Sequence, residues 1–202
     1  SYLVIGVTLV AVPVRMAAEN WDDHDRSNRY TARDIAKAYL DSCDPNAILF
    51  TNGDNDTFPL WYVQEVEGYR TDVRIVNLSL LNTDWYIDQQ RRKAYDGEAV
   101  PFSFNWHEYV QGTRDVLYYR DLGVKGRWDV KDFIQFSKRN DSQVKFKTGG
   151  GKELPLFPQK NFRINIDKEA VYASGGIDIA DSSDVLDYIY WDLKSNVMSK
   201  RD

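Results

Sequence analysis

Two short polar stretches contain the residue types that could do chemistry in this chain. The first is Asn-Gly-Asp-Asn-Asp, which places Asp54 and Asp56 directly after an apolar run. Asn82 and Asp84 follow the next apolar run in the same way. Carboxylate and amide oxygens are the ligands that Mg²⁺ and Ca²⁺ prefer in proteins. These four residues are therefore candidate ligands for either ion.

The same residues also fit an ordinary turn followed by a helix. Asn-Gly-Asp is favoured in turns, and side chains of these types cap helix N-termini, here Asp56, Thr57, Thr83 and Asp84. We favour the turn and cap over ligand binding. The capping interpretation predicts that Asp56→Ala or Thr57→Ala destabilises the domain by about 1 kcal/mol.

The second polar stretch is Asn-Trp-Asp-Asp-His-Asp, which contains Asp22, Asp23 and one of the two histidines, His24. An imidazole beside carboxylates could ligate a metal or transfer protons. A salt-bridged surface loop explains the same composition, and we favour the loop. If the two polar stretches met in space, a metal-dependent hydrolase or phosphoesterase would be the alternative function.

The pattern of apolar residues predicts the elements that position these stretches. Helices and buried strands are expected to alternate, at residues 31–42, 47–52, 57–68, 73–81 and 83–97. Alternation at this spacing is typical of a parallel, doubly wound α/β unit of the Rossmann type. Ligands of such sheets bind at the carboxyl ends of the strands, where Asp54 and Asp84 would lie.

Past Gly97 the sequence is aromatic and rich in turns. A short helix is expected at residues 129–139, and a hairpin at 142–158 with three glycines at its tip. Alternating residues predict strands at 161–174 and 184–196. We therefore expect a β-rich extension, residues 98–202, packed on an α/β unit of residues 19–97.

Composition restricts the classes of partner. The net charge of −5 and the isoelectric point near 5.1 argue against nucleic acid, which requires a basic surface. Cys43 is the only cysteine, so an intrachain disulfide and a cysteine-based zinc cluster are excluded. Aromatic residues make up 14% of the chain, which suits a core, a sugar-binding surface or a membrane-proximal face.

The chain starts with an apolar run from Tyr2 to Val14. A full membrane span needs about twenty apolar residues, so this run could be the end of a transmembrane helix. A buried first strand of a parallel sheet has the same composition. The residues alone leave both interpretations open.

The connected run from "NWDDHDRSNRYTARDIAKAYLDS" through "TNGDNDTFPLWYVQEVEGYRTDVRIVNLSLLNTDWYIDQ" to "RRKAYDG" resembles one family closely. It is similar to the soluble region of bacterial protein O-mannosyltransferase-like membrane proteins, which join a GT-C type membrane part to an α/β region. The resemblance is close from about Val10 to Tyr119 and looser towards Asp202. It implies that residues 1–18 end a membrane helix and that the chain is cut short at its C-terminus.

The resemblance also implies a function. The parent protein would transfer a sugar from a polyprenyl-phosphate donor to a protein or glycan at the bacterial inner membrane, with this region in the periplasm. The catalytic acid of GT-C enzymes lies upstream of this chain, so no residue here inherits it and no cofactor is expected. This region would serve as a scaffold beside the membrane part of the same polypeptide, or bind an acceptor protein or glycan. Exposed tryptophans are the candidate acceptor contacts: Trp61, Trp85, Trp106 and Trp128.

Overall fold

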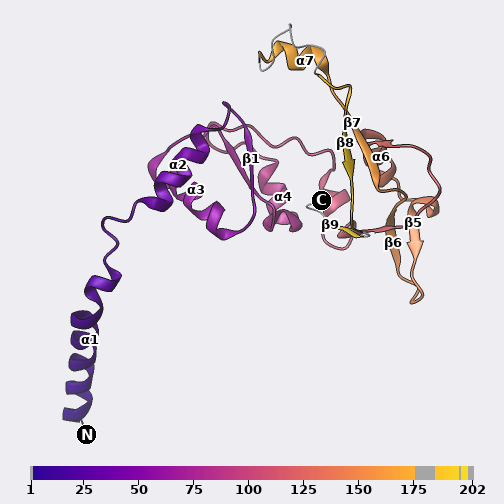
Figure 1. Ribbon diagram of the computed structural model, residues 1–202. Helices are drawn as coiled ribbons and strands as arrows, with labels where there is room; N and C mark the ends of the chain where they lie inside the picture. Colours follow the sequence, from indigo (N-terminus) through magenta and orange to yellow (C-terminus); the bar gives the residue numbers. More distant parts are fainter. Residues whose placement is uncertain (1, 176–184, 196, 200–202) are drawn as a thin grey trace.

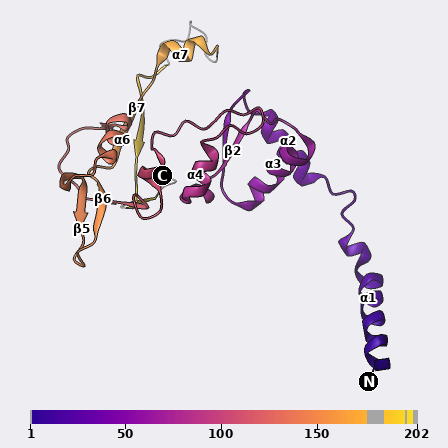
Figure 2. The ribbon, with the colours of Figure 1, turned by 180° about the vertical axis from the view of Figure 1, so that it is seen from behind.

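Figure 1 shows the computed structural model of the chain, in which residues 2–175, 185–195 and 197–199 are described. The chain begins with a long helix that extends away from all other elements, and the view from behind in Figure 2 shows the same separation. An α/β unit follows this helix, and a β-rich region forms the remainder of the chain.

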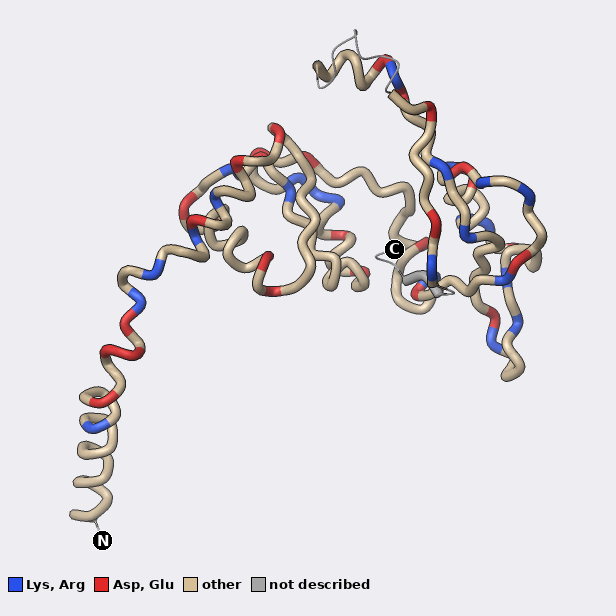
Figure 3. Tube along the Cα trace, in the orientation of Figure 1, with Lys and Arg blue, Asp and Glu red and all other residues tan. Residues whose placement is uncertain are grey.

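The first helix, α1 (Tyr2–His24), has no buried residue. By length and composition it can cross a membrane, and Figure 3 shows no charged residue along its first turns, before Arg15. A membrane anchor and a signal sequence share these properties. Of the two interpretations of the apolar run, the helix is confirmed, and it is suited to membrane association.

Helices and strands alternate in the α/β unit, as the apolar pattern predicts. Its elements are α2 (Thr31–Asp41), β1 (Ile48–Thr51), α3 (Asp54–Glu67), β2 (Arg74–Asn77), the 3₁₀ turn η1 (Leu80–Asn82) and α4 (Asp84–Gln90). The two strands pair in parallel, with Ile48 opposite Arg74 and Thr51 opposite Asn77. Their carboxyl ends therefore lie at one edge, where α3 and η1 begin.

Apolar side chains of β2 alternate between two small cores. Ile75 lies with Leu40 of α2 and Leu60 of α3 in one cluster. Val76 lies with Tyr86 of α4 in the other. Burial of each large apolar side chain contributes about 1.5–3 kcal/mol, so both clusters stabilise the strand pair. The helices α2 and α3 thus pack on one face of the strands, and α4 packs on the opposite face.

The prediction of a doubly wound parallel sheet is wrong. In the described part of the chain, β1 and β2 form a sheet of two strands, and the other strands form separate sheets of mixed orientation. The free edge of β2 is occupied by the hydroxyl of Tyr86, which accepts a hydrogen bond from the Asn77 N–H (3.0 Å). The same hydroxyl lies 3.4 Å from the carbonyl oxygen of Ile75. A side chain therefore satisfies backbone groups that a third strand would have paired.

Two helices differ from their expected limits. The helix α3 begins at Asp54, earlier than the expected Thr57. The helix α4 ends at Gln90 and does not continue to the expected Gly97, since Tyr95 has a left-handed φ of 54° and Ala94 forms an antiparallel bridge with Gly97. A left-handed residue cannot continue a right-handed helix. The chain therefore turns back towards β2 after α4.

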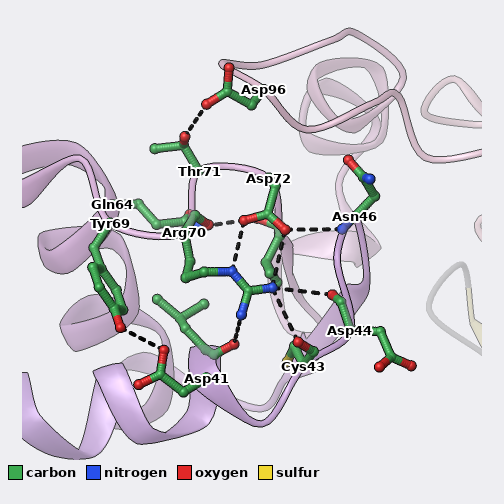
Figure 4. A network of polar contacts seen from close by, with 12 residues as sticks. Asp41, Cys43, Asp44, Asn46, Gln64, Tyr69, Arg70, Thr71, Asp72 and Asp96 are labelled. Atoms are coloured by element: carbon green, nitrogen blue, oxygen red, sulfur yellow. Dashed lines mark hydrogen bonds and ion pairs between the residues drawn. The ribbon is translucent and has the colours of Figure 1, made fainter.

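One arginine ties together the loops at the amino ends of β1 and β2 (Figure 4). Arg70 donates hydrogen bonds to the backbone carbonyls of Leu40 (2.6 Å) and Cys43 (3.1 Å). Asp72 accepts two hydrogen bonds from Arg70 and a third from the backbone N–H of Asn46. This network fixes the loop between α2 and β1 against the loop between α3 and β2.

The β-rich region contains two mixed sheets, one in the order β5-β6-β3-β9 and the other in the order β4-β7-β8. Its elements are α5 (Trp106–Tyr109), β3 (Val116–Tyr119), β4 (Trp128–Asp129), α6 (Val130–Lys138), η2 (Ser142–Val144), β5 (Lys145–Lys147), β6 (Glu153–Phe157), β7 (Asn161–Asn165), α7 (Lys168–Ala173), β8 (Tyr188–Asp192) and β9 (Val197–Ser199). The buried rings of Phe133, Phe157 and Phe162 form the core of this region.

Most of the elements expected in this half are confirmed. The helix α6 lies within the predicted residues 129–139, and β5 and β6 form the predicted hairpin. The strand expected at 161–174 ends at Asn165, because Asp167 then caps the short helix α7 by accepting a hydrogen bond from the Ala170 N–H (3.1 Å). The last expected strand is β8, and its expected end residues, 184 and 196, lie outside the described residues.

Candidate ligand-binding site

A buried polar network closes the carboxyl edge of β1 and β2. The Thr57 hydroxyl donates to the carbonyl of Gly53 (2.6 Å) and accepts from the Asn77 amide (2.8 Å). Because its single proton is used, it accepts from the Thr51 hydroxyl at 2.7 Å. The Asn77 side-chain oxygen accepts in turn from the N–H of Ser79 (2.8 Å). This network joins the two strands to the start of α3.

The two acids of the first polar stretch point into solvent at the start of α3. Asp54 and Asp56 are both exposed, and Gly53 stands at the N-cap with a φ of 103° and without a side-chain cap. The prediction that Asp56 and Thr57 cap this helix is therefore wrong, since the Thr57 side chain belongs to the buried network instead. The two carboxylates still lie where the helix dipole favours negative charge.

The two polar residues after β2, Asn82 and Asp84, have a different role from the one expected. Asn82 is exposed, and the Asp84 carboxylate accepts hydrogen bonds from the backbone N–H groups of Trp85 (2.7 Å) and Gln111 (3.0 Å). Thr83 occupies the N-cap of α4 without a side-chain cap, because its hydroxyl donates to the carbonyl of Leu80 (2.6 Å). Asp84 thus attaches the start of α4 to the turn at Gln111.

The second polar stretch lies at the end of α1, away from the strand ends. Asp22, Asp23 and His24 are exposed, and the His24 Nδ1 lies 2.8 Å from the carbonyl oxygen of Asn20. Figures 1 and 2 show that α1 extends away from the α/β unit, so the two polar stretches do not meet. Among the described residues, no three His, Cys, Asp or Glu side chains converge on a metal-sized site. Binding of Mg²⁺ or Ca²⁺ stays a prediction from the sequence.

A cavity of about 380 Å³ lies between α3 and α4. Its walls include Trp61 and Trp85, two of the four tryptophans that are expected to contact an acceptor, together with Arg74 of β2. Trp106 lies in α5, and Trp128 packs against Phe133 in the β-rich core. Of the four tryptophans expected to contact an acceptor, only Trp61 and Trp85 line this cavity.

One residue in the sequence points to this cavity, although it belongs to no recognised motif. Arg74 stands in the otherwise apolar run Val-Arg-Ile-Val, and a charged residue in a buried strand is rare unless it has a partner. The residues around Tyr95 and Gly97 in the sequence do not indicate that these two positions lie at a cavity. Both acquire their roles only because the chain after α4 folds back onto β2, where Gly97 contacts the Arg74 side chain.

Comparison with known proteins identifies one relationship. Residues 32–202 match the family model described as TMEM260-associated domain 2. No curated protein and no solved structure matches the chain. The match includes the α/β unit, with the cavity and the strand-end network, and the β-rich region.

Proposed function

The chain belongs to the TMEM260-associated domain 2 family, and we propose that it is the membrane-attached accessory domain of a glycosyltransferase-like protein. In this proposal the domain holds an acceptor protein or glycan beside the membrane part of the same polypeptide, which transfers the sugar from a polyprenyl-phosphate donor. The domain itself does not perform the transfer. The resemblance to bacterial O-mannosyltransferase-like proteins supports this role and favours the periplasmic side of the inner membrane.

The exposure of α1 is the observation that carries the proposal. Leu3 is 82% exposed and Leu9 is 70% exposed, although both lie in a continuous apolar helix. An apolar surface of this length is unfavourable in water and is matched by the hydrocarbon core of a bilayer. Charged residues begin at Arg15, where the helix would leave the hydrocarbon region. The α/β unit follows directly, so it would lie close to the membrane surface.

The chemistry of the cavity and of the acids supports a binding role. The aromatic rings of Trp61 and Trp85 face a concave space, which is typical of ligand-binding sites. Asp84, in contrast, is hydrogen-bonded to backbone N–H groups, and its carboxylate holds α4 in position. The aromatic cavity and the structural role of Asp84 therefore support a binding role for this domain rather than a catalytic one.

Membrane attachment can be tested by flotation of the whole chain with liposomes. We expect the natural chain to float with the lipid, and a Val7→Lys/Val10→Lys variant to stay at the bottom of the gradient, because two lysines at the centre of a span oppose insertion. A Tyr39→Lys/Tyr62→Lys variant, altered at half-exposed residues of α2 and α3, is the matched control. A natural chain that fails to float would contradict the proposal.

The accessory role can be tested with the complete parent polypeptide in its membrane. Transfer of sugar to acceptor is measured over a range of acceptor concentrations, for the natural sequence and for Trp85→Ala. An acceptor-holding domain predicts a higher KM for the acceptor at an unchanged kcat. A lower kcat at an unchanged KM would instead place this domain in the chemical step and overturn the proposal.

A further inference from the structure

The cavity lies against the open edge of β2. The backbone N–H groups of Arg74 and Leu78 donate to the carbonyls of Ala47 and Thr51, both at 2.8 Å, so these residues face β1. Because alternate residues of a strand face opposite edges, Ile75 and Asn77 face the other side. In the described part of the chain, side chains from α3 and α4 occupy this second edge and leave the cavity between them.

Arg74 is a buried cation without a carboxylate partner among the described residues. Only 8% of Arg74 is exposed, and its Nη2 donates to the side-chain oxygen of Gln90 (2.9 Å). Its Nε is buried and has no hydrogen-bond partner in the described structure. Burying a charge without an opposite charge is costly, so an anion in the cavity would offset that cost.

Aromatic rings stand at the mouth of the cavity. Trp85 is 54% exposed and Tyr95 is 60% exposed, although both belong to its walls. Tyr95 holds a left-handed φ of 54°, a conformation that is uncommon outside glycine and concentrates at functional sites. Its hydroxyl is hydrogen-bonded to Glu65 of α3, which lines the same cavity, so this bond connects the Tyr95 ring to the α3 wall.

We propose that this cavity binds the carboxylate of an acidic sugar, such as a uronic acid unit of a glycan, with Arg74 as the partner of the carboxylate. A guanidinium and a carboxylate form strong, directional hydrogen bonds. The C–H face of a sugar ring packs on the faces of Trp61, Trp85 and Tyr95. The inference rests on the proposed acceptor-holding role and names the class of glycan held.

Charge balance favours a carboxylate over a phosphate group. The cavity contains one guanidinium, and Glu65 contributes a carboxylate to the same walls. Glu65 repels any anion in this cavity, and it repels a phosphate monoester, which carries close to two negative charges at pH 7, more strongly than a singly charged carboxylate. The exposed amide group of Gln89 in the walls can bind sugar hydroxyls.

The test uses the full chain in detergent micelles and saturation-transfer NMR with four probes: glucuronate, glucose, glucose phosphate and acetate. We expect glucuronate to bind at least about tenfold more tightly than glucose or acetate, because it alone offers both the carboxylate and the ring. Glucose phosphate should bind more weakly than glucuronate. Equal binding of glucose and glucuronate, or tighter binding of glucose phosphate, would overturn the carboxylate assignment.

Two variants locate the binding site. Arg74→Gln should abolish the preference for glucuronate over glucose, provided that its near-ultraviolet circular dichroism matches that of the natural chain. Trp85→Ala, at the mouth of the cavity, should weaken glucuronate binding at least about fivefold. This variant tests the site even if Arg74→Gln does not fold. Trp106→Ala is a matched control, since each tryptophan makes one edge-on ring contact, at 5.6 Å for Trp85 and 5.5 Å for Trp106. Unchanged binding in Trp85→Ala would contradict the site.

The failure of this inference differs from a failure of the proposed function. If acceptor KM in the parent protein rises with Trp85→Ala but glucuronate does not bind, the accessory role stands and the carboxylate assignment falls. If glucuronate binds through Arg74 but the chain does not associate with membranes, the cavity assignment is supported and the proposed membrane attachment is wrong.

Discussion

Arg70 and Asp72 form a two-bond ion pair across a single intervening residue, with distances of 2.8 Å from Nε to Oδ1 and 3.1 Å from Nη2 to Oδ2. Arg70 adopts a left-handed φ of 47°, and its guanidinium lies between the carboxylate of Asp72 and the carbonyls of the loop after α2 (Figure 4). The remaining N–H groups of Arg70 reach the end of α2. The arginine of this ion pair thus joins the end of α2 to the loop that leads into β2.

The first prediction concerns acid stability. The Arg70 guanidinium, helped by the Asn46 N–H, lowers the pKa of Asp72 from 3.8 to about 2. A carboxylate with a lowered folded-state pKa stabilises the fold above its unfolded pKa, and this stabilisation disappears as pH falls through the folded value. We expect the free energy of unfolding to fall by about 1–2 kcal/mol between pH 4 and 2, because solvent screens this partly exposed pair. Thermal unfolding from pH 6 to 2 measures it.

The control for this pH effect is Asp72→Asn. The amide cannot titrate, so the variant should be less stable than the natural chain at pH 6 and should lack this part of the fall between pH 4 and 2. If both proteins lost the same free energy over that range, other carboxylates would cause the acid sensitivity.

Removal of the arginine should have a larger effect. Arg70→Ala leaves the carbonyls of Leu40 and Cys43 without their donor and Asp72 without its cation, and we expect a loss of about 2–4 kcal/mol. Arg92→Ala is the matched control. Arg92 pairs with Asp88 one helical turn away, but its side chain is 73% exposed, so its removal should cost less than about 0.5 kcal/mol. If both variants lost a similar free energy of unfolding, the loop network around Arg70 would contribute no more stability than an exposed ion pair.

Local patterns predicted the α/β unit well but not the size of its sheet. The apolar spacing of α2 and the Asp-Pro after it were sufficient to locate that helix, and the two buried runs located β1 and β2. The alternation predicted a doubly wound parallel sheet, whereas β1 and β2 form a sheet of two strands. The hydroxyl of Tyr86, a residue of α4, bonds to the open edge of β2 and satisfies a backbone group that a further strand would have paired. Burial raises the pKa of Tyr86, so this hydroxyl remains protonated, but no sequence pattern reveals such a contact.

The candidate site was predictable only in part. Residue type correctly placed polar groups at the carboxyl ends of both strands. It did not distinguish which groups would be buried, because Asp56 and Thr57 are adjacent and equally typical of helix starts. Burial separated them: Thr57 is fully buried, whereas Asp56 is exposed. The cavity depends on the fold-back after α4, which brings residues from α3, β2 and the turn at Tyr95 together.

The next prediction concerns the difference in burial between Thr57 and Asp56. Thr57→Val keeps the shape of the side chain but removes the hydroxyl that bonds Thr51, Asn77 and Gly53. Buried partners left without a hydrogen bond cost about 1–3 kcal/mol. Asp56→Ala should change stability by less than about 0.5 kcal/mol, since α3 has no side-chain cap. Thermal unfolding of both variants measures the difference, and a larger loss in Asp56→Ala would restore the capping interpretation.

The last prediction concerns Gly97, which packs directly on the cavity arginine. A Cβ at this position would lie 2.8 Å from Cδ of Arg74 and 3.1 Å from the backbone oxygen of Asp72. The backbone oxygen belongs to the segment held by Arg70, so the Arg74 side chain must move instead. We expect Gly97→Ala to destabilise the fold by about 1–3 kcal/mol and to weaken glucuronate binding. Gly149→Ala, in the hairpin tip with open space around its Cβ position, is the control.

A double-mutant cycle tests whether Gly97→Ala acts through Arg74. If the added methyl group destabilises by displacing the Arg74 stem, truncation of that stem in Arg74→Ala removes most of the clash. The loss caused by Gly97→Ala should then be smaller in the Arg74→Ala background than in the natural chain, by about 1 kcal/mol. Additive losses would mean that the methyl group acts on the Asp72 backbone. The cavity arginine would then be positioned by β2 alone, independently of the turn that holds Tyr95.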